Sequence, residues 1–212
     1  MTDHLSIIKN AVIEGKYKEI QALTQQALEA GLTPRAIIDD ALIAAMDVVG
    51  DAFGSGEIFI PEMLASAITM KSGLSIIKPL LTGDQTKSRG TVVMATIKGD
   101  LHDIGKNLVC MLLEGAGFNV VDLGTDVDID EILNKVKEIK PPVLGLSALL
   151  TTSMPEMRRV IEALEAQGLR KNLKVIVGGA PIDRAFAEKI GADASGANAT
   201  EAVELARRFT DQ

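Results

Sequence analysis

The fold is decided by the stretch TVVMATIKGDLHDIGKN, residues 91–107. Its first seven residues are mostly apolar and rich in β-branched side chains, which predicts a buried strand, and helical spacing of apolar residues begins at Leu108. The polar residues between them therefore form a strand-to-helix turn, which is where α/β folds bind their ligands. His102 lies in this turn, two residues after Asp100. An Asp that binds one imidazole nitrogen leaves the other free to face a metal.

Strands and helices alternate from this stretch onward. The expected strands are 91–97, 119–123, 143–149, 173–177 and a short one around 192–194. The expected helices are about 104–116, 128–140, 153–167, 181–190 and 199–209. Five βα units predict a doubly wound, five-stranded parallel sheet of the flavodoxin-like class, with strand order 2-1-3-4-5. Its switch point lies between strands one and three.

The first part of the chain is different. Residues 1–82 show helical periodicity and little strand character. Thr33-Pro34 begins one of the helices in the usual cap-then-proline order. The pattern predicts four antiparallel helices in a bundle. The polar stretch 83–89 has no apolar spacing and predicts a linker, so that residues 90–212 form a second domain whose position relative to the first can change.

Composition excludes several classes of function. The net charge is −7, which argues against a nucleic-acid partner, and only 3% of residues are aromatic, which disfavours a stacked flavin. No signal peptide or membrane-spanning apolar run is apparent. We therefore expect a cytoplasmic protein with no membrane partner. Cys110 is the single cysteine, which excludes an internal disulfide or a Cys-rich zinc site, and it is expected to be a buried apolar residue.

Polar residues and glycines follow three of the predicted strands, whose carboxyl ends share one crevice. They are Asp100, His102 and Gly105 after strand one, Ser147, Leu149, Thr151 and Ser153 after strand three, and Gly178 and Gly179 after strand four. Each has an ordinary structural explanation: Ser153 begins a capping box with Glu156, and a glycine pair can end a strand. Their joint placement at the switch point is what indicates a ligand site.

Together these clusters resemble the cobalamin-binding signature of corrinoid proteins. The pattern is Asp-x-His-x-x-Gly at 100–105, Ser-x-Leu at 147–149 and Gly-Gly at 178–179, while residues 49–61 resemble the helical cap of the same family. The resemblance covers nearly the whole chain and extends to the cobalamin-binding half of methionine synthase. It is strongest to the small corrinoid proteins of methylotrophic methyltransferase systems.

The resemblance implies a role for each matching residue. His102 would be the lower axial ligand of cobalt, replacing the cofactor's own nucleotide base, and Asp100 and Ser153 would form a relay behind it. The displaced nucleotide tail would enter a slot, and an apolar cap would cover the methyl face of the corrin. The slot would be formed by Gly105, Gly178, Gly179, Ser147 and Leu149, with Asn107 and Thr151 as weaker contacts, and the cap by Phe53 and Ile60, where the family commonly has Leu at the second position.

The implied function is that of a methyl carrier. The cofactor would be cobalamin or a related corrinoid, with methylcobalamin as the loaded state. A substrate:corrinoid methyltransferase would supply the methyl group from methanol, a methylamine, a betaine or a methoxyaromatic compound. A second methyltransferase would pass it to tetrahydrofolate or coenzyme M, and a reductive activator is the third implied partner. The chain is not expected to turn over a substrate alone.

Other classes remain open at this point. A cobalamin-dependent sensor would use a similar cap and fold but needs an output module. A radical isomerase subunit would bind an adenosyl cofactor without this helical cap. A phosphoacceptor receiver would have Asp at the end of strand three, where this chain has Ser147.

Overall fold

The computed structural model describes residues 3–81 and 88–211 of the 212-residue chain. The chain divides into two compact units, Met1–Lys87 with Gly115–Gly117, and Ser88–Glu114 with Phe118–Gln212. Most of the linker predicted at 83–89 lies outside the described residues.

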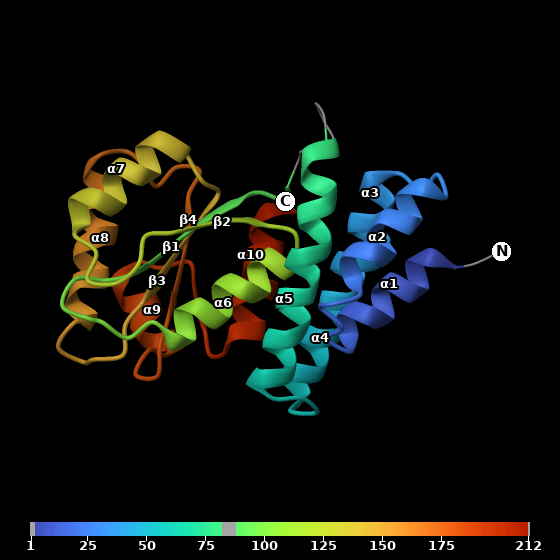
Figure 1. Cartoon of the computed structure of the whole chain (residues 1–212). Helices are drawn as coiled ribbons and strands as arrows, with labels where there is room; N and C mark the ends of the chain where they lie inside the picture. The colour runs from blue at the N-terminus through green and yellow to red at the C-terminus, as the bar shows by residue number, and fades with distance from the viewer. Residues whose placement is uncertain (1–2, 82–87, 212) are drawn as a thin grey trace. The chain divides into compact units, whose positions relative to one another are not determined.

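The described residues of the first unit form the four helices that the sequence predicts, and Figure 1 labels their segments α1 to α5. They are α1 (His4–Ile13), α2 (Ile20–Glu29), a continuous helix formed by α3 (Pro34–Ala36), the π-helical η1 (Ile37–Ile43) and α4 (Ala44–Ser55), and α5 (Ile60–Ile77), which continues into η2 (Lys78–Leu80). Thr33 caps α3 by accepting a hydrogen bond from the Ala36 amide, with Pro34 in the first turn as predicted. The helices bury apolar side chains such as Ile8, Ile20 and Leu42 between them.

The second unit is a parallel sheet of β1 (Thr91–Thr96), β2 (Asn119–Asp122), β3 (Val143–Ser147), β4 (Lys174–Gly178) and β5 (Ala194–Gly196). The strand order is β2-β1-β3-β4-β5, which confirms the predicted topology. Thr96 pairs with Ser147, and Ser147 pairs with Gly178. This register places the ends of β1, β3 and β4 side by side at one edge of the sheet.

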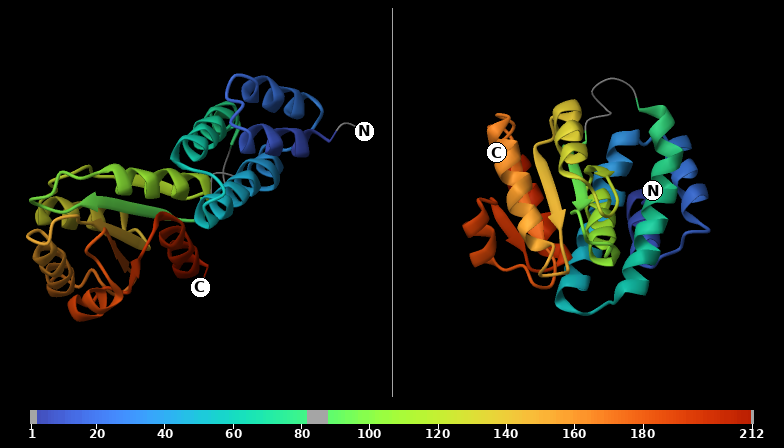
Figure 2. Two further views of the ribbon diagram at one scale, coloured as in Figure 1. Left: turned by 90° about the horizontal axis from the view of Figure 1, so that it is seen from below. Right: turned by 90° about the vertical axis from the view of Figure 1, so that its left-hand side faces the viewer.

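Helices follow the strands in the predicted alternation, as two further views show (Figure 2). They are α6 (Ile104–Gly115), α7 (Ile129–Ile139), α8 (Met154–Ala166), α9 (Arg184–Ile190) and α10 (Ala199–Thr210). Val93, Leu144 and Val175 lie on one face of the sheet and share a core with buried residues of α7, α8 and α9. Alternate residues such as Val92 point to the opposite face. Within residues 3–81 and 88–211, no helix is long and apolar enough to cross a membrane.

The third strand ends at Ser147, two residues earlier than predicted. The amides of Leu149 and Leu150 donate hydrogen bonds to the side chain of Asp100 instead of extending the sheet. An acceptor from another part of the chain therefore ends this strand. Apolar spacing contains no signal for such an acceptor.

The two glycines that end β4 differ in their surroundings. Gly179 has a φ of +132°, and a Cβ atom there would lie 1.8 Å from the carbonyl oxygen of Ala148. A Cβ atom on Gly178 would meet only the carbonyl oxygen of Gly196, at an ordinary 3.4 Å. Gly179 is therefore required by the backbone itself, whereas Gly178 is not.

We predict that Gly179→Ala lowers the free energy of unfolding by about 3 kcal/mol, because the methyl group combines backbone strain with a steric clash. Gly178→Ala, the matched control, should lower it by less than about 1 kcal/mol. Urea unfolding followed by circular dichroism measures both. Equal stability of the two variants would show that the backbone does not require glycine at position 179.

Candidate functional site

A buried carboxylate lies at the centre of the site. Asp100, which is fully buried, follows β1 and accepts five hydrogen bonds. Its Oδ1 accepts from the amide of His102 at 3.0 Å and lies 2.8 Å from Nδ1 of the same residue. Its Oδ2 accepts from the amides of Leu149 and Leu150, at 2.7 and 3.0 Å, and from the hydroxyl of Ser153 at 3.0 Å. One side chain thus joins the loops that follow β1 and β3.

These bonds keep the carboxylate ionised. Burial raises the pKa of Asp100, but the amides of Leu150, His102 and Leu149, together with the His102 ring, outweigh it and hold the pKa well below its usual range. An ionised carboxylate only accepts hydrogen bonds, so Nδ1 of His102 must carry the proton in their contact. In the neutral ring Nε2 then has a free lone pair. The His102 side chain is 53% exposed, which leaves that nitrogen open to a ligand.

Ser153 contributes to the Asp100 cluster and not to the cap predicted from its sequence. Its side chain is nearly fully buried, and its hydroxyl lies 3.0 Å from Asp100 Oδ2 and 2.8 Å from the Leu150 carbonyl oxygen. Ser153 precedes α8 without a side-chain capping bond, and Glu156 pairs with Arg159 at 2.6 Å. The capping-box interpretation was therefore wrong, because the hydroxyl faces the charged acceptor Asp100.

Other contacts hold the backbone of the histidine loop, residues 97–103, which connects β1 to α6 and contains His102. The buried hydroxyl of Thr96, at the end of β1, donates to the carbonyl oxygen of His102 at 3.0 Å. Asn107 donates through its side-chain amide to Asp103 at 3.0 Å and accepts from Lys106 at 2.9 Å. Its side chain is thus engaged within the first turn of α6. Sequence reasoning missed Thr96, because a hydroxyl within a strand has no distinctive spacing.

Several large apolar side chains are exposed close to His102 in the chain and in the loop after β3. A Cβ atom on Gly105 would meet nothing within 4 Å. Leu101 and Ile104 are 73% and 77% exposed, and Leu149 and Leu150 are each 41% exposed. The two loops that Asp100 joins thus both expose large apolar side chains. Of the remaining predicted residues, Ser147 lies beside Gly178 in the sheet, whereas Thr151 is exposed in the loop before α8.

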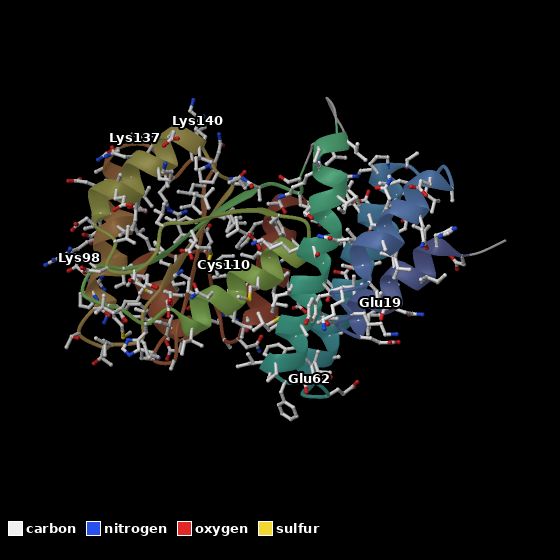
Figure 3. The ribbon with its side chains drawn as sticks, in the orientation of Figure 1. Glu19, Glu62, Lys98, Cys110, Lys137 and Lys140 are labelled. Atoms are coloured by element: carbon white, nitrogen blue, oxygen red, sulfur yellow. The ribbon has the colours of Figure 1, made fainter. Side chains whose placement is uncertain are left out.

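The predicted cap residues belong to the helical unit. Phe53 is half-buried on α4, and Ile60, the first residue of α5, is 49% exposed. Phe59 is more exposed, at 68%, and its amide donates to Glu62, which is labelled in Figure 3. Phe53 and Ile60 are therefore at least partly exposed on the helical unit, and their role as a cap stays a prediction.

Cys110 has no part in the site. It lies on α6 (Figure 3) and is buried, as predicted. Burial, followed by the charge of Asp122, raises the pKa of its thiol to about 12. The thiol is therefore unreactive near neutral pH, because the thiolate is the nucleophilic form. The neighbouring Lys106 is also buried and pairs with Asp122.

Comparison with known proteins agrees with this geometry. Residues 90–205 match the family described as B12 binding domain, and residues 6–78 match a second family with the same description. The first match alone covers more than half of the chain. The chain therefore belongs to the B12-binding proteins.

Within this family the chain is similar to corrinoid proteins. It is 44% identical over 197 residues to the trimethylamine corrinoid protein of Methanosarcina barkeri, covering 92% of this chain and 91% of that protein. It is 42% identical over 206 residues to dimethylamine corrinoid protein 1 of Methanosarcina acetivorans, covering 97% and 96%. A crystal structure of the methanol:cobalamin methyltransferase complex of Methanosarcina barkeri matches with a TM-score of 0.91 and 35% identity, covering 99% of this chain and 80% of that one.

The residues present fit a corrinoid. Among the described residues, no group of three or more His, Cys, Asp or Glu side chains could hold a metal ion. A metal held by the single imidazole of His102 must therefore bring most of its ligands with it, as haem iron does in its macrocycle. Leu101 and Ile104, which flank His102 in the chain, expose apolar side chains that a macrocycle could cover, and the position of Gly105 is open.

We predict that Asp100→Asn lowers the free energy of unfolding at neutral pH by about 2 kcal/mol, because an amide NH₂ group would face the donor amides of Leu149 and Leu150. The folded pKa of Asp100 is lowered, so its stabilising effect is present above the unfolded value of 3.8 and is lost as the pH falls below it. The stability difference between wild type and variant should therefore shrink in acid.

Urea unfolding across this pH range measures the effect. Asp103→Asn is the matched control, because Asp103 lies in the same loop but is exposed. Its side chain accepts a hydrogen bond from Asn107 and takes no part in the Asp100 cluster. A difference between wild type and Asp100→Asn that stays constant down to strongly acidic pH would contradict the assigned role of the carboxylate.

Proposed function

We propose that this chain is a corrinoid methyl carrier that holds its cofactor through His102. The observation that supports this most strongly is the contact between Asp100 and Nδ1 of His102 at 2.8 Å, which leaves Nε2 as the nitrogen without a bond to Asp100 in a side chain that is 53% exposed. The chemistry that a bound corrinoid supplies is the reversible carriage of a methyl group on cobalt. The protein residues orient the lower ligand, bind the cofactor and exclude water.

The Asp100–Ser153 relay would control where the proton of the site resides. If His102 held the metal, Nδ1 would keep its proton against the Asp100 carboxylate, and Nε2 would be the nitrogen left for the metal. Asp100 would thus fix both the tautomer and the orientation of the ring. Ser153 can turn its hydroxyl between Asp100 and the Leu150 carbonyl, so its bond to Asp100 is adjustable.

The remaining predicted residues would bind the rest of the cofactor. Gly105 and Gly178 leave room for a tail, which Ser147 and Leu149 would line. Gly179 belongs to this slot as well, although the backbone alone accounts for its glycine. Asn107 and Thr151 are kept as weaker contacts. Phe53 and Ile60 would cover the methyl face, where an apolar lid excludes water from the reactive cofactor.

The loading partner would be a methyltransferase specific for a methylamine, because the similar proteins named above are trimethylamine and dimethylamine corrinoid proteins. The receiving methyltransferase would act on tetrahydrofolate or coenzyme M, and a reductive activator would restore the cofactor after oxidation. The cytoplasmic location expected from the sequence stays a prediction.

Reconstitution with diaquacobinamide, a corrinoid that lacks the nucleotide base and so brings no nitrogen ligand below its cobalt, tests the cofactor assignment. We predict that the wild-type protein binds it and shows the absorption spectrum of a nitrogen-ligated corrinoid, and that His102→Ala loses this spectrum and binds roughly 10- to 100-fold more weakly. His4→Ala, which removes the only other histidine, is the matched control and should behave as wild type. A His102→Ala complex with an unchanged spectrum would exclude His102 as the ligand.

A further inference from the structure

The loop between β2 and α7 runs alongside the end of β1. The Thr96 amide donates to the carbonyl oxygen of Gly124 at 3.0 Å, and the Val127 amide donates to the carbonyl oxygen of Thr96 at 3.1 Å. Val127 also forms a parallel bridge with Ile97. These bonds bring Asp126 beside the first residues of the histidine loop.

Asp126 forms two hydrogen bonds with that loop, one as an acceptor and one as a donor. Its Oδ1 accepts a hydrogen bond from the Gly99 amide at 2.9 Å, and its own amide donates to the carbonyl oxygen of Asp100 at 2.9 Å. Both partners in the first bond have left-handed backbones, with φ of +55° at Asp126 and +82° at Gly99. The left-handed region is uncommon for a residue other than glycine, and such strain persists where surrounding contacts require it.

The charge of Asp126 is maintained by its neighbours. Lys98 Nζ lies 3.5 Å from Asp126 and 3.3 Å from Asp128, and its side chain points outward in Figure 3. The Gly99 amide is the main cause that holds the pKa of Asp126 below its usual range. Asp126 is therefore an ionised acceptor at neutral pH.

From this geometry we propose that Asp126 is a positioning residue for the corrinoid site. It fixes the backbone of Gly99 and Asp100, and the Asp100 carboxylate then holds His102 in the orientation that a metal requires. Asp126 would touch neither the cofactor nor a substrate. The inference depends on the proposed function, because it assigns Asp126 to the support of the same ligand.

Three variants separate this role from simple loss of charge. Asp126→Gly removes the carboxylate but still accepts the left-handed backbone. Asp126→Asn removes the charge but keeps an oxygen that can accept from Gly99, and Asn tolerates the left-handed region. Asp128→Asn removes a carboxylate that also pairs with Lys98, and it has no side-chain capping bond in α7.

The test is a titration of each apo-protein with diaquacobinamide, which has no nucleotide base of its own, followed by absorption spectroscopy. We expect Asp126→Gly to bind about tenfold more weakly, as for other residues that support a metal ligand, and to lose part of the nitrogen-ligated spectrum. Asp126→Asn should restore both properties, and Asp128→Asn should match wild type. Wild-type binding by Asp126→Gly, or an equal loss in Asp128→Asn, would overturn the proposal.

A measurement on the wild-type apo-protein covers the case in which Asp126→Gly does not fold. Hydrogen exchange should show the Gly99 amide protected, although Gly99 lies in an exposed loop, and Asp126→Asn should preserve that protection. Rapid exchange of the wild-type Gly99 amide would overturn the proposal. If wild-type protein bound no diaquacobinamide, the proposed function itself would fail, which is a distinct result.

Discussion

The site depends on the carboxylate of Asp100, which is fully buried and yet ionised. A buried charge is costly unless hydrogen bonds compensate for it, and here five bonds from His102, Leu149, Leu150 and Ser153 do so. The same bonds determine the local structure, because they end β3 and tie its loop to the loop after β1. The hydrogen bonds that stabilise the charge of Asp100 therefore also hold the imidazole of His102 in place.

The parallel sheet makes this arrangement possible. Its register sets Thr96, Ser147 and Gly178 side by side, so the loops that follow β1, β3 and β4 begin at the same edge. β2 lies on the other side of β1, and its loop supplies Asp126 to the backbone of the histidine loop. The two neighbours of β1 therefore hold the loop from opposite sides, while His102 itself stays exposed.

The secondary-structure elements, the strand order and part of the site could be predicted from the sequence. The periodicity predicted four helices followed by five βα units, and the strand order followed from the doubly wound topology. The Asp-x-His spacing predicted the contact between Asp100 and the imidazole. The role of Ser153 was less certain from spacing, since Ser-x-x-Glu also fits a capping box. Only the observed bond to Asp100 decides between the two.

Contacts made by backbone groups could not be predicted from the sequence. The amides of Leu149 and Leu150 bind Asp100 whatever their side chains are, so their residue types contain no signal for the contact. Asp126 was missed for a different reason: only the strands at the switch point were considered, although the loop after strand two also adjoins strand one. That Phe53 and Ile60 cover a cofactor stays a prediction, because periodicity does not determine how two domains are arranged.

The tautomer of His102 in the apo-protein tests the Asp100–His102 arrangement most directly. It can be measured by ¹⁵N NMR of the ring in a His4→Ala background, which leaves His102 as the only histidine. At a pH where the ring is neutral, the account predicts a proton on Nδ1 and an unprotonated Nε2. A neutral ring with its proton on Nε2 would contradict the account, because the nitrogen that faces solvent would then have no lone pair for a metal.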